Sequence, residues 1–150
     1  MSTVTVGQLC ELFSQIAEGK ITGEAIQELI EKASRIALSR LFEKTIRLAR
    51  KTASEISDVC LRAEALTAIA KALAEARMFD QARKTASEIS NTYLRAEALA
   101  AVAGNSREAK DFDQARKTAS EISDTYSDTY LRAKALAAVA AALAEAMAEN

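Results

Sequence analysis

The stretch FDQARKTASEIS, Phe79–Ser90, returns letter for letter at Phe112–Ser123, 33 residues later. Its last eight letters, RKTASEIS, also stand 33 residues earlier, at Arg50–Ser57. A second string keeps the same period, since LRAEAL occupies both Leu61–Leu66 and Leu94–Leu99. Self-similarity at a fixed period of about 20–50 residues is the signature of a protein built by stacking one repeated unit.

The composition of this unit predicts helices. The 150 residues include no Pro and only four Gly, the residues that most often interrupt regular structure, so long helices with short connections are expected. Apolar residues recur at helical spacing over Leu61–Leu73 and again over Phe79–Ile89, and Asp58, Asn91 and Asp124 are placed as N-caps of the segments that follow them. The sequence therefore predicts an all-α fold whose unit is an antiparallel helix pair.

We expect a single domain of about eight helices. Thr5 and Gln8 have the spacing of a capping box, and Gly19 is placed to end the helix that they open. A helix pair cannot bury its apolar stripe alone, so neighbouring pairs are expected to stack as an α-solenoid. The expected segments are an N-terminal capping helix in 1–22, helix pairs in 23–57, 58–90 and 91–127, and an unpaired terminal helix in 128–150.

The residue types argue against catalysis. The chain has no His, so the commonest general base is missing and neither a Ser–His nor a Cys–His pair can form. It has no Gly-rich phosphate loop, and Cys10 and Cys60 do not have metal-ligand spacing. We therefore expect a protein that is not an enzyme and that uses no cofactor or metal.

The charge balance bears on partners and location. Twenty basic and 21 acidic residues leave a net charge of −1, which attracts neither nucleic acid nor an anionic membrane. Basic pairs recur at Arg50–Lys51, Arg83–Lys84 and Arg116–Lys117, as in RNA-binding repeats, but a Glu four residues after each Lys offsets them. Residues 1–20 lack the features of a signal peptide. We expect a cytoplasmic protein that binds neither nucleic acid nor membranes.

The unit resembles the tetratricopeptide (TPR) repeat, a helix–turn–helix of about 34 residues. The first helix of that family carries two large residues three apart, then a small residue, then another large one three further on. The same order is found here in Leu66, Ile69, Ala70 and Leu73 and in Leu136, Val139, Ala140 and Leu143. FDQA at Phe79–Ala82 resembles the family's turn segment. Because the family's Trp and closing Pro are absent and the period is 33, the resemblance over residues 24–148 is to a TPR-like solenoid.

The resemblance implies a protein-interaction module that binds a peptide or a helix on its concave face, which first helices line. Positions that correspond to that face are Glu64, Thr67, Lys71, Glu97, Ala100, Gly104, Lys134, Ala137 and Ala141. The near-identity of the units leaves a second interpretation open, a structural or engineered self-assembling repeat protein without a natural ligand.

The first break in the repeat is GNS at Gly104–Ser106, where the preceding unit has Lys71-Ala72-Leu73. Gly in a helix interior costs about 1 kcal/mol relative to Ala, and Ser in place of a core Leu forfeits packing. We expect the helix to end near Ala103 or to kink there. Gly104, Asn105 and Ser106 are therefore a candidate hinge.

The second break is a duplication, because SDTY at Ser123–Tyr126 is repeated at once at Ser127–Tyr130. Ser, Asp and Thr favour caps and turns, so we expect a longer loop, with Ser127 and Asp128 as a second hinge. The terminal helix is then joined by a long, flexible loop, and no second helix of the expected repeat covers its apolar side. This predicts a homo-oligomer, most simply a dimer, that associates through Ala138, Ala142, Leu143 and Met147.

Overall fold

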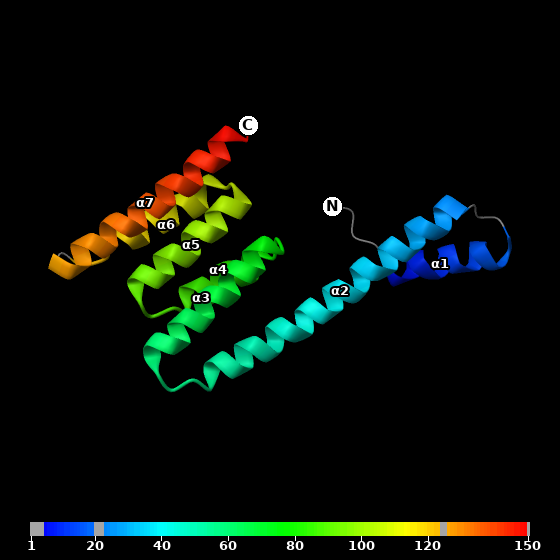
Figure 1. The fold of residues 1–150 in the computed structure, drawn as a ribbon, viewed down its shortest axis with the longest axis horizontal. Helices are drawn as coiled ribbons and strands as arrows, with labels where there is room; N and C mark the ends of the chain where they lie inside the picture. Colours follow the sequence, from blue (N-terminus) through cyan, green and yellow to red (C-terminus); the bar gives the residue numbers. More distant parts are fainter. Residues whose placement is uncertain (1–4, 20–22, 124–125, 150) are drawn as a thin grey trace. The chain divides into compact units, whose positions relative to one another are not determined.

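The computed structural model describes residues 5–19, 23–123 and 126–149. Within these ranges the regular structure is entirely helical, which confirms the all-α prediction (Figure 1). The helices are α1 (Val6–Ala17), α2 (Gly23–Ser54), α3 (Val59–Glu75), α4 (Phe79–Ser87), α5 (Thr92–Ser106), α6 (Ala109–Ser120) and α7 (Tyr126–Ala148). None of these described helices is long and apolar enough to cross a membrane.

The helix pair expected in residues 23–57 is instead the single 32-residue helix α2, so the structure has seven described helices where the sequence predicted about eight. The next unit turns at Arg77, which has a φ of 63°, and restarts with an acidic first turn at Asp80. In α2 the equivalent of Asp80 is Arg47, and an acidic side chain favours a helix start where a basic one does not. The helix therefore continues through the expected turn.

The chain forms two compact units, Met1–Leu48 and Ala49–Asn150. In the first unit, the predicted capping box opens α1, because the Thr5 amide donates to Gln8 Oε1 at 2.9 Å and the Gln8 amide donates to Thr5 Oγ1 at 3.2 Å. Gly19 follows α1 with a φ of +70°, a conformation that glycine adopts without strain. The first unit leaves many large apolar side chains exposed: Val6, Phe13, Ile26, Ile30, Leu38, Leu41 and Leu48.

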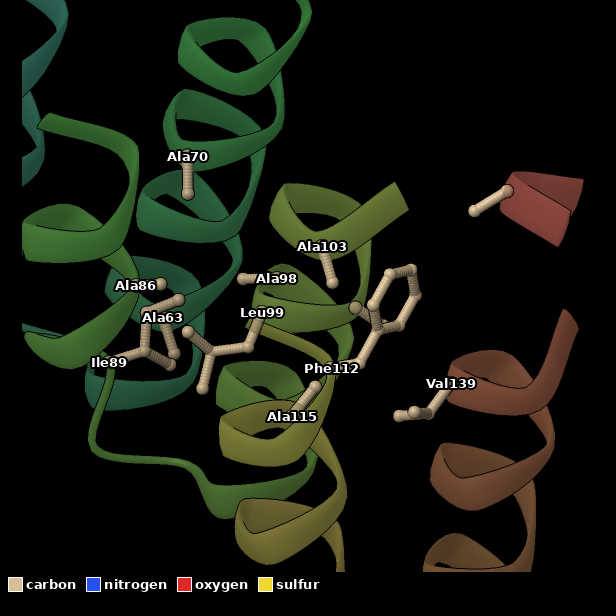
Figure 2. Packing of buried hydrophobic residues seen from close by; sticks show 12 residues of the cluster. Ala63, Ala70, Ala86, Ile89, Ala98, Leu99, Ala103, Phe112, Ala115 and Val139 are labelled. Carbon is tan, nitrogen blue, oxygen red and sulfur yellow. The ribbon is translucent and has the colours of Figure 1, made fainter. Parts of the chain in front are cut away.

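The second unit is organised around α5. Helix α5 packs against α3 and α4 on one side and against α6 and α7 on the other (Figure 1). Its core is made mainly of alanines, which allow helix axes to approach closely, with a few larger side chains between them (Figure 2). The buried core residues include Ala63, Ala70, Ala86, Ile89, Ala98, Leu99, Ala103, Phe112, Ala115 and Val139.

The loops that join successive helix pairs are fixed in the same way 33 residues apart. Asp58 caps α3 by accepting a hydrogen bond from the Leu61 amide, and Asn91 caps α5 by accepting one from the Leu94 amide, both at 2.9 Å. Both caps were predicted from the sequence; the third predicted cap, Asp124, lies outside the described residues. Each side-chain cap of this kind stabilises a helix by about 1 kcal/mol.

An arginine reinforces each of these loops. Arg62 donates from Nη1 to the Ile56 carbonyl, and Arg95 donates from Nη1 to the Ile89 carbonyl, again both at 2.9 Å. The repeated sequence thus produces repeated tertiary contacts, as well as repeated helices.

Of the two alternatives predicted, an end near Ala103 is wrong, because α5 continues to Ser106 and its C-cap is Arg107, which has a φ of 58°. The other alternative, a kink near Ala103, stays a prediction. Helix α6 then begins three residues earlier than its counterpart α4, relative to the repeat. The Ser106 hydroxyl explains this shift, since it lies 2.5 Å from Asp111 Oδ2 in the first turn of α6 and accepts a hydrogen bond from the Glu108 amide. The GNS break therefore moves the turn toward the N-terminus.

The duplicated SDTY does not lengthen a loop as predicted. Ser127–Tyr130 lies inside α7, which begins at Tyr126. Four residues make about one helical turn, so the duplication extends the helix and keeps its apolar stripe nearly in phase. Asp128 in the first turn also favours the helical conformation, because a negative charge there interacts well with the helix dipole.

Candidate interaction surface

Helix α7 has one buried and one exposed apolar line. Ala135, Val139 and Ala146 are buried in the second unit. Leu136, Ala140, Leu143 and Met147, which we call the tail face, follow one another at spacings of four, three and four residues and so lie along one side of the helix. Leu136, Leu143 and Met147 are 37%, 42% and 67% exposed.

The same positions are covered in the two preceding units. Leu66, Ala70 and Leu73 of α3 correspond to Leu136, Ala140 and Leu143; Ala70 and Leu73 are fully buried, and Leu66 packs against the core. In α5 the corresponding residues Leu99 and Ala103 are buried too. Helix α4 packs against α3 and α6 packs against α5, whereas no described helix follows α7. Leu136, Ala140 and Leu143 therefore stand at core positions of the repeat that no described helix covers, whereas Met147 corresponds to the exposed Arg77 and Lys110.

Only part of the predicted self-association set belongs to this face. Leu143 and Met147 do, but Ala138 and Ala142 are half-buried. Ala142 packs against the core, and a Cβ built on Gly104 would lie 3.5 Å from its Cβ, so this side of α7 faces α5. The sequence prediction missed Leu136, which the repeat register could have identified as the equivalent of Leu66 and Leu99.

The positions predicted to line a concave groove are placed unevenly. The side chains of Thr67 and Ala100 are buried, and Thr67 Oγ1 donates to the Ala63 carbonyl at 2.8 Å, so neither is available to a partner. Lys71, Glu97 and Gly104 are half-buried, whereas Glu64, Lys134, Ala137 and Ala141 are exposed.

Several of the charged groove positions are occupied by contacts within the chain. Lys71 Nζ lies 3.2 Å from Glu97 Oε1, an ion pair that joins α3 to α5. Lys134 Nζ lies 5.8 Å from the centroid of the Tyr93 ring, and a hydrogen bond with Tyr93 is the main reason that the pKa of Lys134 is raised. These contacts connect neighbouring first helices and leave few groups on this side to recognise a ligand.

A hollow of about 330 Å³ lies between the ends of α5 and α7. Gly104 and Ala142 form part of its wall, and Arg77, Arg107, Glu145 and Glu149 bring charges of both signs to it. Arg107 and Glu149 form an ion pair across it. Because its charges are balanced and partly paired, the hollow presents no single chemistry to a ligand.

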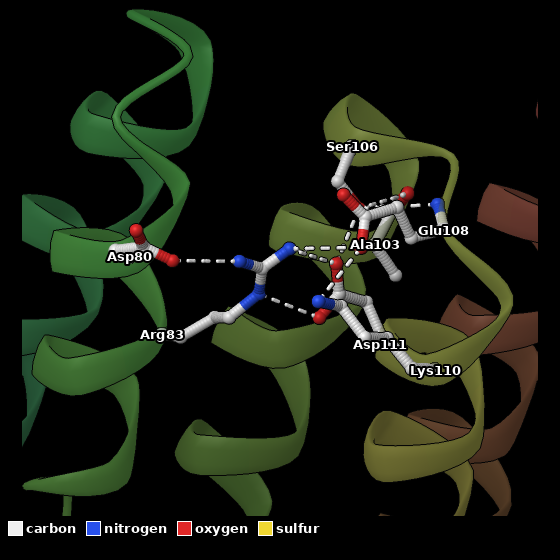
Figure 3. Close-up of polar contacts among 7 residues, drawn as sticks. All are labelled: Asp80, Arg83, Ala103, Ser106, Glu108, Lys110 and Asp111. Atoms are coloured by element: carbon white, nitrogen blue, oxygen red, sulfur yellow. Dashed lines mark hydrogen bonds and ion pairs between the residues drawn. The ribbon is translucent and has the colours of Figure 1, made fainter.

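A polar network around the buried Asp111 was not predicted (Figure 3). Asp111, which is 5% exposed, accepts two hydrogen bonds from Arg83, from Nε to Oδ1 and from Nη2 to Oδ2, each at 2.8 Å. This pair ties α4 to α6. The hydrogen bond from Arg83 is the main cause that lowers the pKa of the Asp111 carboxyl below its ordinary value of 3.8.

The sequence contains the signal for this contact in two departures from the repeat. Asp111 stands where the preceding unit has Met78, and Ser106 stands where it has Leu73. Both departures belong to one network, since the Ser106 hydroxyl also bonds Asp111. A polar side chain at one core position of a repeat thus predicts a polar partner at another.

Comparison of the chain with protein-family models, with curated proteins and with solved structures finds no match. Within the described ranges, no group of three or more Cys, Asp or Glu side chains is arranged to hold a metal ion. The exposed apolar side chains of the tail face are the observation that a proposed function must explain.

Proposed function

We propose that the chain is a non-catalytic protein-interaction module, built as a TPR-like α-solenoid, that binds a helix on the tail face of α7. The carrying observation is the exposure of Leu136 and Leu143, because the preceding units bury their equivalents Leu99 and Leu73 under a following helix. The repeated caps and arginine contacts of α3 and α5 support the solenoid interpretation.

The chain itself indicates what kind of helix fits. Helices α4 and α6, which cover the equivalent faces, present the same pattern: an aromatic residue, then Ala, Ala and Ile three, seven and ten residues later. In the second occurrence of this pattern, in and just after α6, these residues are Phe112, Ala115, Ala119 and Ile122, all buried. A partner helix is expected to place small residues against α7 and a large one at each end.

The expected affinity is modest. Full burial of a Leu or Met side chain contributes about 1.5–3 kcal/mol, and the three large residues of the tail face are already partly covered. The cost of ordering both partners offsets much of this gain. A surface of this size suits association that is assisted by tethering or by several contacts, and it suits an isolated short helix less well.

Binding of a peptide across the first helices is the less favoured arrangement. Thr67 and Ala100 are buried, and Lys71 and Glu97 satisfy one another. That face therefore supplies fewer free groups than the tail face supplies exposed apolar area.

The test is a titration of the labelled chain with a peptide of residues 108–123, which contains α6. NMR shift changes are expected to cluster at residues 136–147 and to saturate at millimolar peptide. Leu143→Glu is expected to abolish them, because it places a charge in the contact. Ala144→Glu, which adds the same charge beside the tail face, is the matched control. Changes that are absent, or that survive in Leu143→Glu, would contradict the proposal.

A further inference from the structure

The second unit has another uncovered apolar surface at its opposite end. Leu61, near the start of α3, is 57% exposed, whereas its equivalents Leu94 and Leu131 are half-buried and pack against the core. Leu131 packs against a cluster of Ala96, Ala119, Ile122 and Ala135, and the first three of these belong to the unit before it in sequence. Leu61 belongs to α3, the first of these repeated first helices in the second unit.

Two residues that precede α3 in the chain are also less buried than their repeat equivalents. Ala49 and Ile56 are half-buried, whereas their equivalents Ala82 and Ile89 are completely buried. In the complete units, these Ala and Ile side chains cover the stripe of a first helix that precedes them in the repeat. We call Ala49, Ile56 and Leu61 the head face. No first helix of the second unit covers its exposed part, although Ala53, between Ala49 and Ile56, is buried, and no described helix covers the tail face of α7.

We propose that the tail face of one copy binds the head face of a second copy, so that the molecules associate head to tail. The contact continues the repeat across the junction: residues 49–57 of the second copy cover α7 as α6 covers α5, and α3 of the second copy lies beside α7 as α7 lies beside α5. The partner is thus a second copy of this chain. This inference rests on the proposed function and names the partner of the tail face.

Charge complementarity supports the direction of the contact. Within the chain, Arg50 Nη2 lies 3.6 Å from Glu88 Oε1, which joins one second helix to the next. The repeat equivalents of this pair across the junction are Arg116 of one copy and Glu55 of the other. The side chain of Arg116 is 67% exposed, and Glu55 is exposed as well. The junction therefore offers one pair of opposite charges, with Arg116 also 3.6 Å from Asp113 Oδ1 of its own helix.

A head-to-tail contact uses two different surfaces, so each copy keeps one free end and association continues beyond a dimer unless a ring closes. Analytical ultracentrifugation of the intact chain is expected to show a mass that rises with concentration past two copies. Reducing agent is required, because Cys10 and Cys60 are exposed and could crosslink copies. An intact chain that stays monomeric at millimolar concentration overturns the inference.

Two single variants separate this contact from a symmetric one. Leu143→Glu blocks the tail face and Leu61→Glu blocks the head face; both positions are exposed, so the fold is expected to persist, and circular dichroism checks this. Each variant alone is expected to associate at least about tenfold more weakly, since a charge would be buried unpaired. A 1:1 mixture is expected to form a dimer and nothing larger, through the intact tail of one variant and the intact head of the other.

A symmetric α7–α7 dimer gives the opposite result, because Leu61→Glu then associates like the intact chain and the mixture forms no heterodimer. If that happens while Leu61→Glu still binds the α6 peptide on α7, the head-to-tail inference falls and the proposed function stands. If the peptide does not bind, the proposed function fails as well. Charge reversal is a further check: Arg116→Glu and Glu55→Arg are each expected to weaken association, and mixing the two is expected to restore it in part.

Discussion

At the scale of single residues, the departures from the repeat are more informative than its conserved letters. Ser106 and Asp111 replace apolar residues of the preceding unit, and together with Arg83 they form a polar network that ties α4 to the first turn of α6. From the sequence alone, Ser106 in place of a core Leu predicts lost packing. The structure shows that the lost packing is compensated by a hydrogen bond, which only a three-dimensional view could reveal.

Asp111→Asn is expected to lower the free energy of unfolding by about 1–3 kcal/mol at neutral pH, because hydrogen bonds to a charged group are lost. Asp113→Asn, at an exposed position of the same helix, is the control and is expected to change little. Chemical denaturation of the two variants measures the difference. Equal stabilities would contradict a stabilising role for the Arg83–Asp111 pair.

The same pair predicts a pH dependence. The pKa of Asp111 is lower in the folded chain than its ordinary value of 3.8, so its contribution to stability is present above that value. The contribution is lost as the pH falls below 3.8 through the folded pKa. Denaturation curves between pH 7 and pH 2 are expected to fall less steeply for Asp111→Asn in this acid range. Parallel curves would show that the carboxylate is not responsible.

Gly104→Ala is expected to stabilise the chain by about 0.5–1 kcal/mol, because Ala restricts the unfolded chain and favours the helix. The added methyl group would make an ordinary contact with Ala142 at 3.5 Å. Thermal unfolding measures the effect. Destabilisation would instead favour the prediction from the sequence that Gly104 serves as a hinge.

At the scale of elements, identity between units determined how well the sequence could be interpreted. The caps of α3 and α5 follow from repeated letters and were predicted, whereas the end of α5 was not. The continuity of α2 was not, since the first unit is degenerate and carries Arg47 where an acid starts α4. The effect of the duplicated SDTY was also predicted wrongly. Its Ser, Asp and Thr residues favour caps and turns, which suggested a longer loop, but four residues fit about one helical turn and extend α7 instead.

Neighbouring residues of α2 provide a prediction for the first unit. Leu29 is buried and Ile30 is 54% exposed. Leu29→Ala is expected to cost about 2–4 kcal/mol, because it removes buried methyl groups, while Ile30→Ala changes stability by about 0.5 kcal/mol or less. Hydrogen exchange of the α2 amides in both variants tests this difference. Similar losses of protection would show that the two side chains are equally exposed.

At the scale of the whole molecule, the sequence predicted helical repeats and an uncovered last helix, but not which side of that helix is free. Ala138 and Ala142 were predicted to associate, but both are half-buried and Ala142 packs against the core; Leu136 was missed. The apolar spacing of α7 is compatible with burial on either side, so only the position of α5 and α6 decides the question. The head face was not predicted at all, because its residues are more buried in the following units: Ala82 and Ile89 completely, and Leu94 and Leu131 in part.

The central claim is that the tail face of α7 is a surface that binds a helix. A chain extended by one helix tests this claim most directly. Appending residues 109–123 after Asn150 supplies an eighth helix, joined by Glu149 and Asn150 as α6 is joined by Arg107 and Glu108. A control extension carries Ser at its four apolar positions. Hydrogen exchange of the α7 amides is the measurement. The account predicts at least about tenfold slower exchange at residues 136–147 in the extended chain than in the control, since tethering raises the effective concentration of the added helix. Equal exchange rates in the two chains would contradict it.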